Sequence, residues 1–283
     1  MNDASVHPSF DRFGPAIPGS PVILSVPHAG RDYPARLLEA LRVPPGALLP
    51  LEDRHVDAVA HAARKDEIML VASRPRAWID LNRGEHERDP AVESGGSLMS
   101  LPMASTKVKS GLGLVPRRVG AAGDLWARRF TSAEIDRRIA ADHRPYHAAL
   151  ADALRAAHVR FGVAVLLDIH SMPTLGSERP QLVLGDRMAQ SAGPEIVAAI
   201  ERAAARSGLR VGRNVPYAGG HVLDRHGNPA RDVHAVQLEF DRLLYLDPLT
   251  MVPSPDLSRT AMQLRAIIDA AADAALPVPL AAE

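Results

Sequence analysis

The chain has 283 residues, of which 46% are hydrophobic and 23% are charged, and its formal net charge is zero. This balance leaves no basic surplus for nucleic acid or anionic membranes, so we expect neither as a partner. The absence of cysteine excludes disulfides, cysteine nucleophiles and thiolate metal sites, and leaves His, Asp and Glu as the strong ligands.

Length and hydropathy predict one globular domain without a membrane anchor. A chain of this length can bury a substantial core as one large α/β domain or as two small ones, and we expect a single domain over residues 1–283. The segment 1–18 carries charges and prolines without an apolar core, and no run is long enough to span a bilayer. We therefore expect a cytoplasmic protein, whose oligomeric state the sequence leaves open.

The first half of the chain predicts short strands, one helix and a long loop. The predicted strands are residues 22–28, 68–73 and 77–81. A helix is predicted over about 53–65, with Asp53 as its N-cap. Residues 84–123 are rich in Gly, Pro and Ser without periodicity, which predicts a long loop excursion.

The second half alternates predicted helices and strands. Residues 132–158 have helical composition and start at Thr131 or Ser132, with a kink expected at Pro145. The remaining predicted elements are strands over 163–170, 181–184 and 235–239, helices over 194–207 and 257–275, and a loop over 217–232 that carries His221 and His226. Such alternation is typical of a three-layer αβα sandwich around a mostly parallel or mixed sheet.

Three of the apolar runs end in a potential metal ligand or catalytic acid. His28, His170 and Glu239 each close one predicted strand, and sheets of this class bind ligands at the carboxyl ends of their strands. A catalytic zinc usually has three protein ligands and one open position. We therefore interpret His28 and His170 as metal ligands and Glu239 as the general base of a hydrolytic site.

The third ligand is an aspartate. Asp53 and Asp57 lie one helical turn apart and so on one face of the predicted helix; we prefer Asp53 and keep Asp57 as the alternative, although both also suit a helix cap and a first-turn dipole partner. The same ligand types accept other divalent transition metals besides Zn²⁺.

Further polar residues surround this set in the sequence. Asp168 shares a strand face with His170 and is expected either to orient that imidazole or to bind backbone. Arg83 suits bidentate recognition of a substrate carboxylate, or else a structural ion pair. Ser171 cannot complete a triad with His170, because neighbouring strand residues face opposite sides.

Five other histidines lie outside the predicted set of metal ligands. His221, His226 and His234 are expected in surface loops, or else in contact with the ligand. His143 and His147 have the spacing of a helical metal pair, but Pro145 between them is expected to spoil the helix.

At these residues the chain resembles the N-formylglutamate amidohydrolase family. The blocks that carry the resemblance, in chain order, are Ser-Val-Pro-His-Ala-Gly at 25–30, Glu-Asp-Arg-His-Val-Asp at 52–57, Asp-Leu-Asn-Arg at 80–83, Arg-Pro-Tyr-His at 144–147, Asp-Ile-His-Ser-Met-Pro at 168–173, Tyr-Ala-Gly-Gly at 217–220 and Gln-Leu-Glu-Phe-Asp-Arg at 237–242. The resemblance implies a zinc-peptidase-like α/β fold and hydrolysis of N-formyl-L-glutamate to formate and L-glutamate, a step of histidine degradation.

Carried onto this sequence, the resemblance implies specific roles. The implied zinc ligands are His28, His170 and an aspartate of the 53/57 pair, with Glu239 as the catalytic carboxylate and Arg83, Asn82 and His221 at the substrate. His221 and Arg54 depart from the aromatic residues expected in relatives. This departure keeps open a different N-acyl amino acid or small peptide as the substrate, or a non-catalytic member that binds an amino acid.

Overall fold

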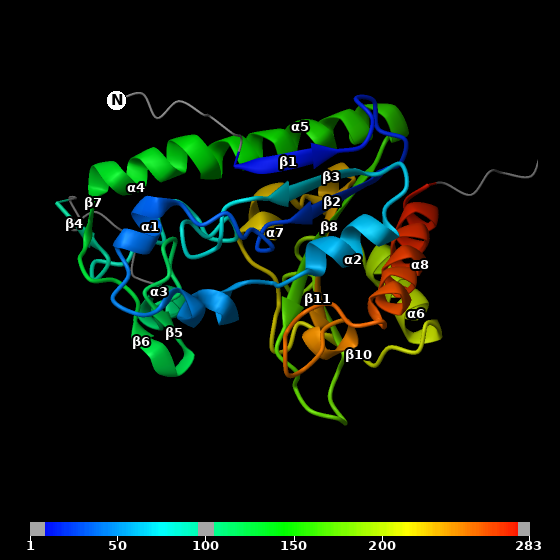
Figure 1. The fold of residues 1–283 in the computed structure, drawn as a ribbon. Coiled ribbons are helices and arrows are strands. Elements are labelled where there is room, and N and C mark those ends of the chain that lie inside the picture. Colours follow the sequence, from blue (N-terminus) through cyan, green and yellow to red (C-terminus); the bar gives the residue numbers. More distant parts are fainter. Residues whose placement is uncertain (1–8, 96–104, 277–283) are drawn as a thin grey trace, which may run out of the picture. The chain divides into compact units, whose positions relative to one another are not determined.

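The computed structural model describes residues 9–95 and 105–276 (Figure 1). The chain divides into two compact units that alternate along the sequence. Unit 1 comprises Met1–Asp11, Pro27–Glu52 and Val71–Ala148, and unit 2 comprises Arg12–Val26, Asp53–Leu70 and Ala149–Glu283.

Unit 2 contains most of a seven-stranded mixed sheet with the order β1-β3-β2-β8-β11-β9-β10. Its strands are β1 (Phe10–Phe13), β2 (Val22–Val26), β3 (Ile68–Ala72), β8 (Ala164–Met172), β9 (Leu182–Gly185), β10 (Val211–Arg213) and β11 (Val233–Asp241). Strands β2 and β11 run parallel to β8 on its two sides, and β9 runs antiparallel to β11. Every residue of β2, β3, β8 and β9 is buried, which explains why these strands read as continuous apolar runs.

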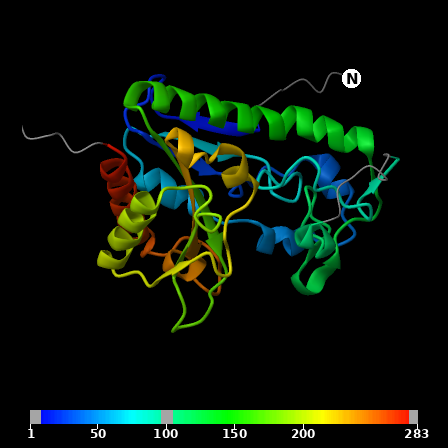
Figure 2. The same ribbon diagram turned by 180° about the vertical axis from the view of Figure 1, so that it is seen from behind.

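Helices cover both faces of the central strands of unit 2. The main helices of this unit are α2 (Val56–Ala63), α6 (Pro194–Arg206), α7 (His221–His226) and α8 (Leu257–Ala275), with short 3₁₀ turns η5 (Pro229–Arg231) and η6 (Arg242–Leu244). Helices α2 and α8 contact β2 and β8, and α7 contacts β8 and β11. Figures 1 and 2 show α2 and α8 on one face of these strands and α7 on the other. The predicted α/β class with a mixed central sheet is confirmed.

Unit 1 consists of short elements and long connections. These are α1 (Ala35–Glu39), η1 (Pro45–Leu51), β4 (Glu93–Ser94), α3 (Thr106–Lys109), β5 (Arg118–Val119), η3 (Gly120–Ala122), β6 (Gly123–Asp124), β7 (Phe130–Thr131), α4 (Ser132–Arg138), the π-helical turn η4 (Ile139–His143) and α5 (Arg144–Phe161), whose later turns belong to unit 2. Strands β4 and β7 pair in parallel, and β5 and β6 pair antiparallel. The described part of 84–123 thus holds only short elements.

A π-helical turn, η4, joins α4 to α5 just before Pro145, where the sequence predicts a kink. The start at Thr131 is confirmed by a capping box, in which Thr131 and Glu134 satisfy each other's backbone N–H groups. Pro145 has no N–H and its ring crowds the carbonyl one turn back. The wider turn of η4 relieves that clash, so the helical path continues.

Three further predictions are wrong. Residues 77–81 form no strand, since Pro75 starts a turn in which the Trp78 N–H donates to its carbonyl. Helix α2 begins at Val56, after His55 in a left-handed conformation with φ 58°, so Asp53 is not its cap. The predicted loop at 217–232 contains α7, because buried Val222 and Leu223 anchor that turn.

Within residues 9–95 and 105–276, no helix combines the length and apolarity needed to cross a bilayer.

Candidate functional site

In unit 2, five polar side chains line three adjacent strands near their carboxyl ends. The parallel register of β8 and β11 pairs His170 directly with Glu239. One step back along the same face, Asp168 is paired with Gln237 on one side and with Ser25 of β2 on the other. All five residues are buried, so the backbone ladder fixes a polar row inside an apolar sheet.

Both ring nitrogens of His170 face carboxylates. Nε2 lies 2.8 Å from Asp168 Oδ2, and Nδ1 lies 3.0 Å from Asp53 Oδ2. The other oxygen of Asp168 accepts a hydrogen bond from Ser25 Oγ at 2.7 Å. Asp168 is fully buried and fixed on both oxygens, so it holds the Nε2–H of His170 and directs Nδ1 towards Asp53.

The electrostatics around His170 favour positive charge. Burial by itself lowers the pKa of this imidazole, but Asp168, a hydrogen bond donated to Asp53 and the charge of Glu239 raise the pKa well above its usual value. Three carboxylates around one buried ring create a strong local demand for a cation.

Two residues of the motif at the end of β11, Gln237 and Arg242, hold the carboxylates of Glu239 and Asp53. Gln237 Nε2 donates to Glu239 Oε1 at 2.8 Å, which restrains the carboxylate. Arg242 donates from Nε to Ser171 Oγ at 3.1 Å and from Nη2 to Asp53 Oδ1 at 3.3 Å. The motif that carries Gln237 and Arg242 is visible in the sequence, but their roles depend on contacts that spacing alone does not reveal.

In unit 1, Asp80 organises the surroundings of His28. Its Oδ1 lies 2.7 Å from His28 Nε2 and accepts the Asn82 N–H at 2.8 Å, while Oδ2 accepts from Arg76 Nε at 2.8 Å. Burial by itself raises the pKa of Asp80. The opposing effect of Arg76, His28 and Arg83 is larger and holds this pKa well below its usual value. Asp80 is therefore an ionised acceptor that receives the Nε2–H of His28 and leaves Nδ1 as the ring nitrogen turned away from this carboxylate.

Arg83 and Asn82 follow Asp80 in a buried segment of the same unit. Arg83 donates from Nε to the Leu112 carbonyl at 2.8 Å and from Nη1 to its neighbour's carbonyl, that of Asn82, at 2.7 Å. These bonds fix the guanidinium and use the N–H of Nε and one of the two N–H groups of Nη1. Sequence reasoning identified this arginine but did not anticipate that backbone carbonyls occupy two of its nitrogens.

The pair of histidines that the sequence interpretation set aside supports this segment. His143 and His147 are fully buried, and their ring centroids lie 4.5 Å apart. His143 Nε2 contacts the Arg83 carbonyl at 2.8 Å, and His147 Nε2 contacts the Leu81 carbonyl at 2.9 Å. The two histidines therefore position the backbone of 81–83, a role that their spacing in the sequence does not reveal.

The remaining candidates differ in burial. Asp53 is 3% exposed and contacts His170, whereas Asp57 lies in the first turn of α2 and is partly exposed. His221 is the first residue of α7 and is also partly exposed. The expected surface positions of His226 and His234 are wrong: both are buried, and burial lowers the pKa of His226 to about 3.

The donor chemistry of both units fits a divalent metal. Nε2 of His28 and Nε2 of His170 each contact a buried aspartate. This arrangement orients an imidazole so that its other nitrogen, Nδ1, can bind a metal. In unit 2, the 3.0 Å between His170 Nδ1 and Asp53 Oδ2 is close to the roughly 3.3 Å that separates two ligands of a tetrahedral zinc.

Known proteins match this chain over most of its length. A profile of the family N-formylglutamate amidohydrolase matches residues 20–246. An N-formylglutamate deformylase from Pseudomonas aeruginosa is 31% identical over 237 residues, which cover 80% of this chain and 82% of that protein. One from Pseudomonas putida is 27% identical with the same coverage.

A solved structure supports the same relationship. The crystal structure of N-formylglutamate amidohydrolase from Ralstonia eutropha JMP134 superimposes with a TM-score of 0.83 and 34% identity, and the match covers 94% of this chain and 97% of that one. Sequence profile, sequence relatives and fold thus agree with the resemblance carried by the motifs. The chain belongs to the N-formylglutamate amidohydrolase family.

Proposed function

We propose that this chain hydrolyses the amide bond of N-formyl-L-glutamate to give formate and L-glutamate. Family membership and the activity named for its relatives support the substrate. The observation that carries the proposal is the in-register pair of His170 and Glu239 on β8 and β11, with Asp53 beside the histidine. In histidine degradation this reaction would release the glutamate skeleton.

The proposal assigns His28, Asp53 and His170 as ligands of one Zn²⁺, with Asp57 as the alternative to Asp53. The support is the motif order together with the Nε2-anchored histidines found in each unit. When bound, the ion supplies Lewis acidity towards the formyl carbonyl and lowers the pKa of water at the site.

Glu239 is the proposed general base. It removes a proton from the attacking water, whose oxygen forms a bond to the formyl carbon. The same proton passes to the amide nitrogen as the C–N bond breaks, which releases formate and the amine of glutamate. Gln237 donates to Oε1 of Glu239 and so restrains the orientation of the carboxylate that would accept the proton.

The proposal assigns substrate carboxylate binding to Arg83, with Asn82 and His221 as further contacts. Arg83 is buried and fixed by two backbone carbonyls, so it contributes a pre-oriented charge at little entropic cost. Because Nε donates to the Leu112 carbonyl, a two-nitrogen fork to a carboxylate would use Nη1 and Nη2.

The alternative substrate class is a different N-acyl amino acid or small peptide, and it is favoured by His221 and Arg54, which stand where relatives are expected to have aromatic residues. A change of residue in the pocket alters which side chain of the substrate gains most from binding. A panel of N-formyl amino acids compared by kcat/KM separates the two candidates: the proposal requires N-formyl-L-glutamate to lead.

The test of the mechanism is the variant Glu239→Gln, with Glu178→Gln as a matched control at an exposed position. Loss of the base should lower formate release by about 10²–10⁴-fold, while bound zinc measured by elemental analysis is unchanged. The control should keep both properties. Formate release by Glu239→Gln at the wild-type rate would remove Glu239 from the mechanism, and a zinc-free, fully active wild type would remove the metal.

A further inference from the structure

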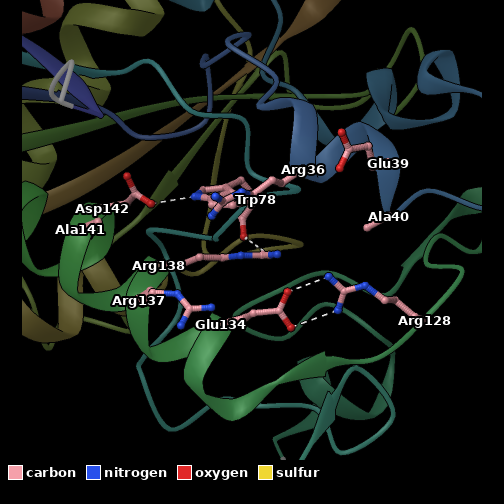
Figure 3. Close-up of a pocket in the computed structure, with 10 residues that line it drawn as sticks. All are labelled: Arg36, Glu39, Ala40, Trp78, Arg128, Glu134, Arg137, Arg138, Ala141 and Asp142. Carbon is pink, nitrogen blue, oxygen red and sulfur yellow. Dashed lines mark hydrogen bonds and ion pairs between the residues drawn. The ribbon is translucent and has the colours of Figure 1, made fainter. Parts of the chain in front are cut away.

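Unit 1 contains a cavity of about 470 Å³ that none of the proposed catalytic residues lines. Its walls come from α1, the turn at Trp78, the segment before β7 and the run from α4 into η4. The lining residues carry four arginines against three carboxylates: Arg36, Arg128, Arg137 and Arg138, with Glu39, Glu134 and Asp142, beside Trp78, Ala40 and Ala141 (Figure 3).

Arg138 is the fixed centre of this cavity. It is 4% exposed, and its guanidinium carbon lies 3.9 Å from the ring centroid of Trp78 and 4.1 Å from that of Phe130. Stacking between two rings stabilises the cation and sets its plane. Figure 3 shows the guanidinium reaching under Trp78 towards the middle of the lining residues.

The hydrogen-bonding capacity of Arg138 is largely unused. Among the described residues, its one hydrogen bond runs from Nη1 to the Trp78 carbonyl at 3.0 Å, and it forms no ion pair. A guanidinium has five N–H donors, and a buried charge without a counterion is costly. Burial lowers the pKa of Arg138 to about 10, yet it remains charged at neutral pH.

The acidic residues of the lining are mostly engaged elsewhere. Both oxygens of Glu134 accept from Arg128, and Asp142 accepts from the Trp78 indole N–H at 2.7 Å. Arg36 and Arg137 form no hydrogen bond or ion pair with any residue in 9–95 or 105–276 and are exposed at the rim. Three arginines therefore face the cavity with Glu39 as the remaining uncommitted carboxylate.

We propose that this cavity binds a small polyanion that carries carboxylate or phosphate groups. One anionic group would accept from the unused N–H donors of Arg138 in the fork geometry that guanidinium offers to such oxygens, and a second would lie at Arg36 and Arg137. The volume suits a small molecule, and the indole of Trp78 provides an apolar wall. The site belongs to no step of the proposed hydrolysis.

Calorimetric titration of the full chain with succinate, inorganic phosphate and acetate tests this assignment. We expect saturable binding of succinate or of phosphate, and the stronger of the two identifies the source of the anionic groups. Acetate, with one charge, should bind more weakly. Acetate binding as tightly as both others, or absence of saturable binding for all three, would overturn the proposal.

Variants localise the binding. Arg36→Ala and Arg137→Ala are exposed changes that preserve the fold and should each weaken binding about tenfold; Arg138→Lys keeps the charge but should also weaken it, because the fork is lost. The exposed Arg202→Ala removes the same charge in unit 2 and should leave affinity unchanged. Equal weakening by Arg202→Ala, or full affinity in both rim variants, would show that the anion binds elsewhere.

A spectroscopic readout connects binding to the cavity wall. The chain has two tryptophans, so Trp126→Phe leaves Trp78 as the single indole. Anion titration should then change its emission with the same midpoint as the calorimetric curve. A silent Trp78 with calorimetric binding intact would place the anion outside this cavity.

Discussion

At the scale of single residues, two aspartates perform the same task in the two units. Asp80 fixes Nε2 of His28, and Asp168 fixes Nε2 of His170. Asp168 was predictable from its position two residues before the histidine on one strand. Asp80 was not, because its partner lies 52 residues away in sequence and only the fold brings the pair together.

We predict that Asp168→Asn and Asp80→Asn each lower zinc affinity about 10–100-fold. The amide keeps the size of the side chain but removes the charge that holds the imidazole hydrogen on Nε2. Competition with a chromophoric chelator measures the change. Asp273→Asn, at an exposed position of α8, is the control, and an unchanged zinc affinity in Asp168→Asn would argue that His170 is not a ligand.

At the scale of secondary-structure elements, the central sheet was the most predictable part. Strands β2, β8 and β11 are buried apolar runs with polar ends, and this pattern requires no knowledge of long-range contacts. The short edge strands β1 and β10 carry exposed polar residues and were missed. The run 77–81 is apolar because loops bury it, which hydropathy cannot distinguish from a buried strand.

The turn after His28 requires a glycine at position 30, because the backbone of Ser73 and Arg74 packs closely against it. A Cβ added at Gly30 would overlap the Arg74 carbonyl oxygen and lie 2.7 Å from the Ser73 carbonyl carbon. We predict that Gly30→Ala destabilises the protein by about 1–3 kcal/mol or more, measured by urea unfolding. Gly46→Ala is the matched control, since a Cβ there meets nothing within 4 Å; equal stability of the two variants would contradict the close approach.

The start of α4 carries a pH-dependent contribution to stability. Hydrogen bonds from Arg128 hold the pKa of Glu134 at about 2, against its ordinary 4.5. Because the folded-state pKa is the lower one, the contribution is complete above pH 4.5 and disappears as the pH falls towards 2.

We therefore predict that Glu134→Gln lowers the Tm at pH 7 and that the gap to wild type narrows between pH 4.5 and about 2. Thermal melts across this range measure it. Glu39→Gln, an exposed glutamate of α1, should leave the Tm close to wild type throughout. A gap that stays constant with pH would mean that the lost interaction does not involve the ionised carboxylate.

At the scale of the whole molecule, the order of segments along the chain contains no mark of the two compact units. Each unit is assembled from three separate stretches, so no linker or change in composition marks a boundary. A prediction of domains from sequence depends on such marks, and here only the contact pattern contains the division. The assignment of His28 from unit 1 and of Asp53 and His170 from unit 2 to one metal ion stays a prediction.

The expected single domain makes a thermodynamic prediction. Since neither unit is a continuous stretch and the division falls within β1 and β3, we expect unfolding in one transition with equal calorimetric and van't Hoff enthalpies. Differential scanning calorimetry on the full chain measures both. Two resolved transitions would instead identify the units as independent domains.

The pairing of His170 with Glu239 also limits where residues can be inserted or deleted during the evolution of this chain. Gain or loss of one residue inside β11 turns either Glu239 or the buried residues before it to the other side of the sheet. The turn at 173–180, which is mostly exposed, imposes no such restriction. Insertions that survive in descendants of this sequence should therefore accumulate in that turn, while β11 keeps its length even where its side chains diverge.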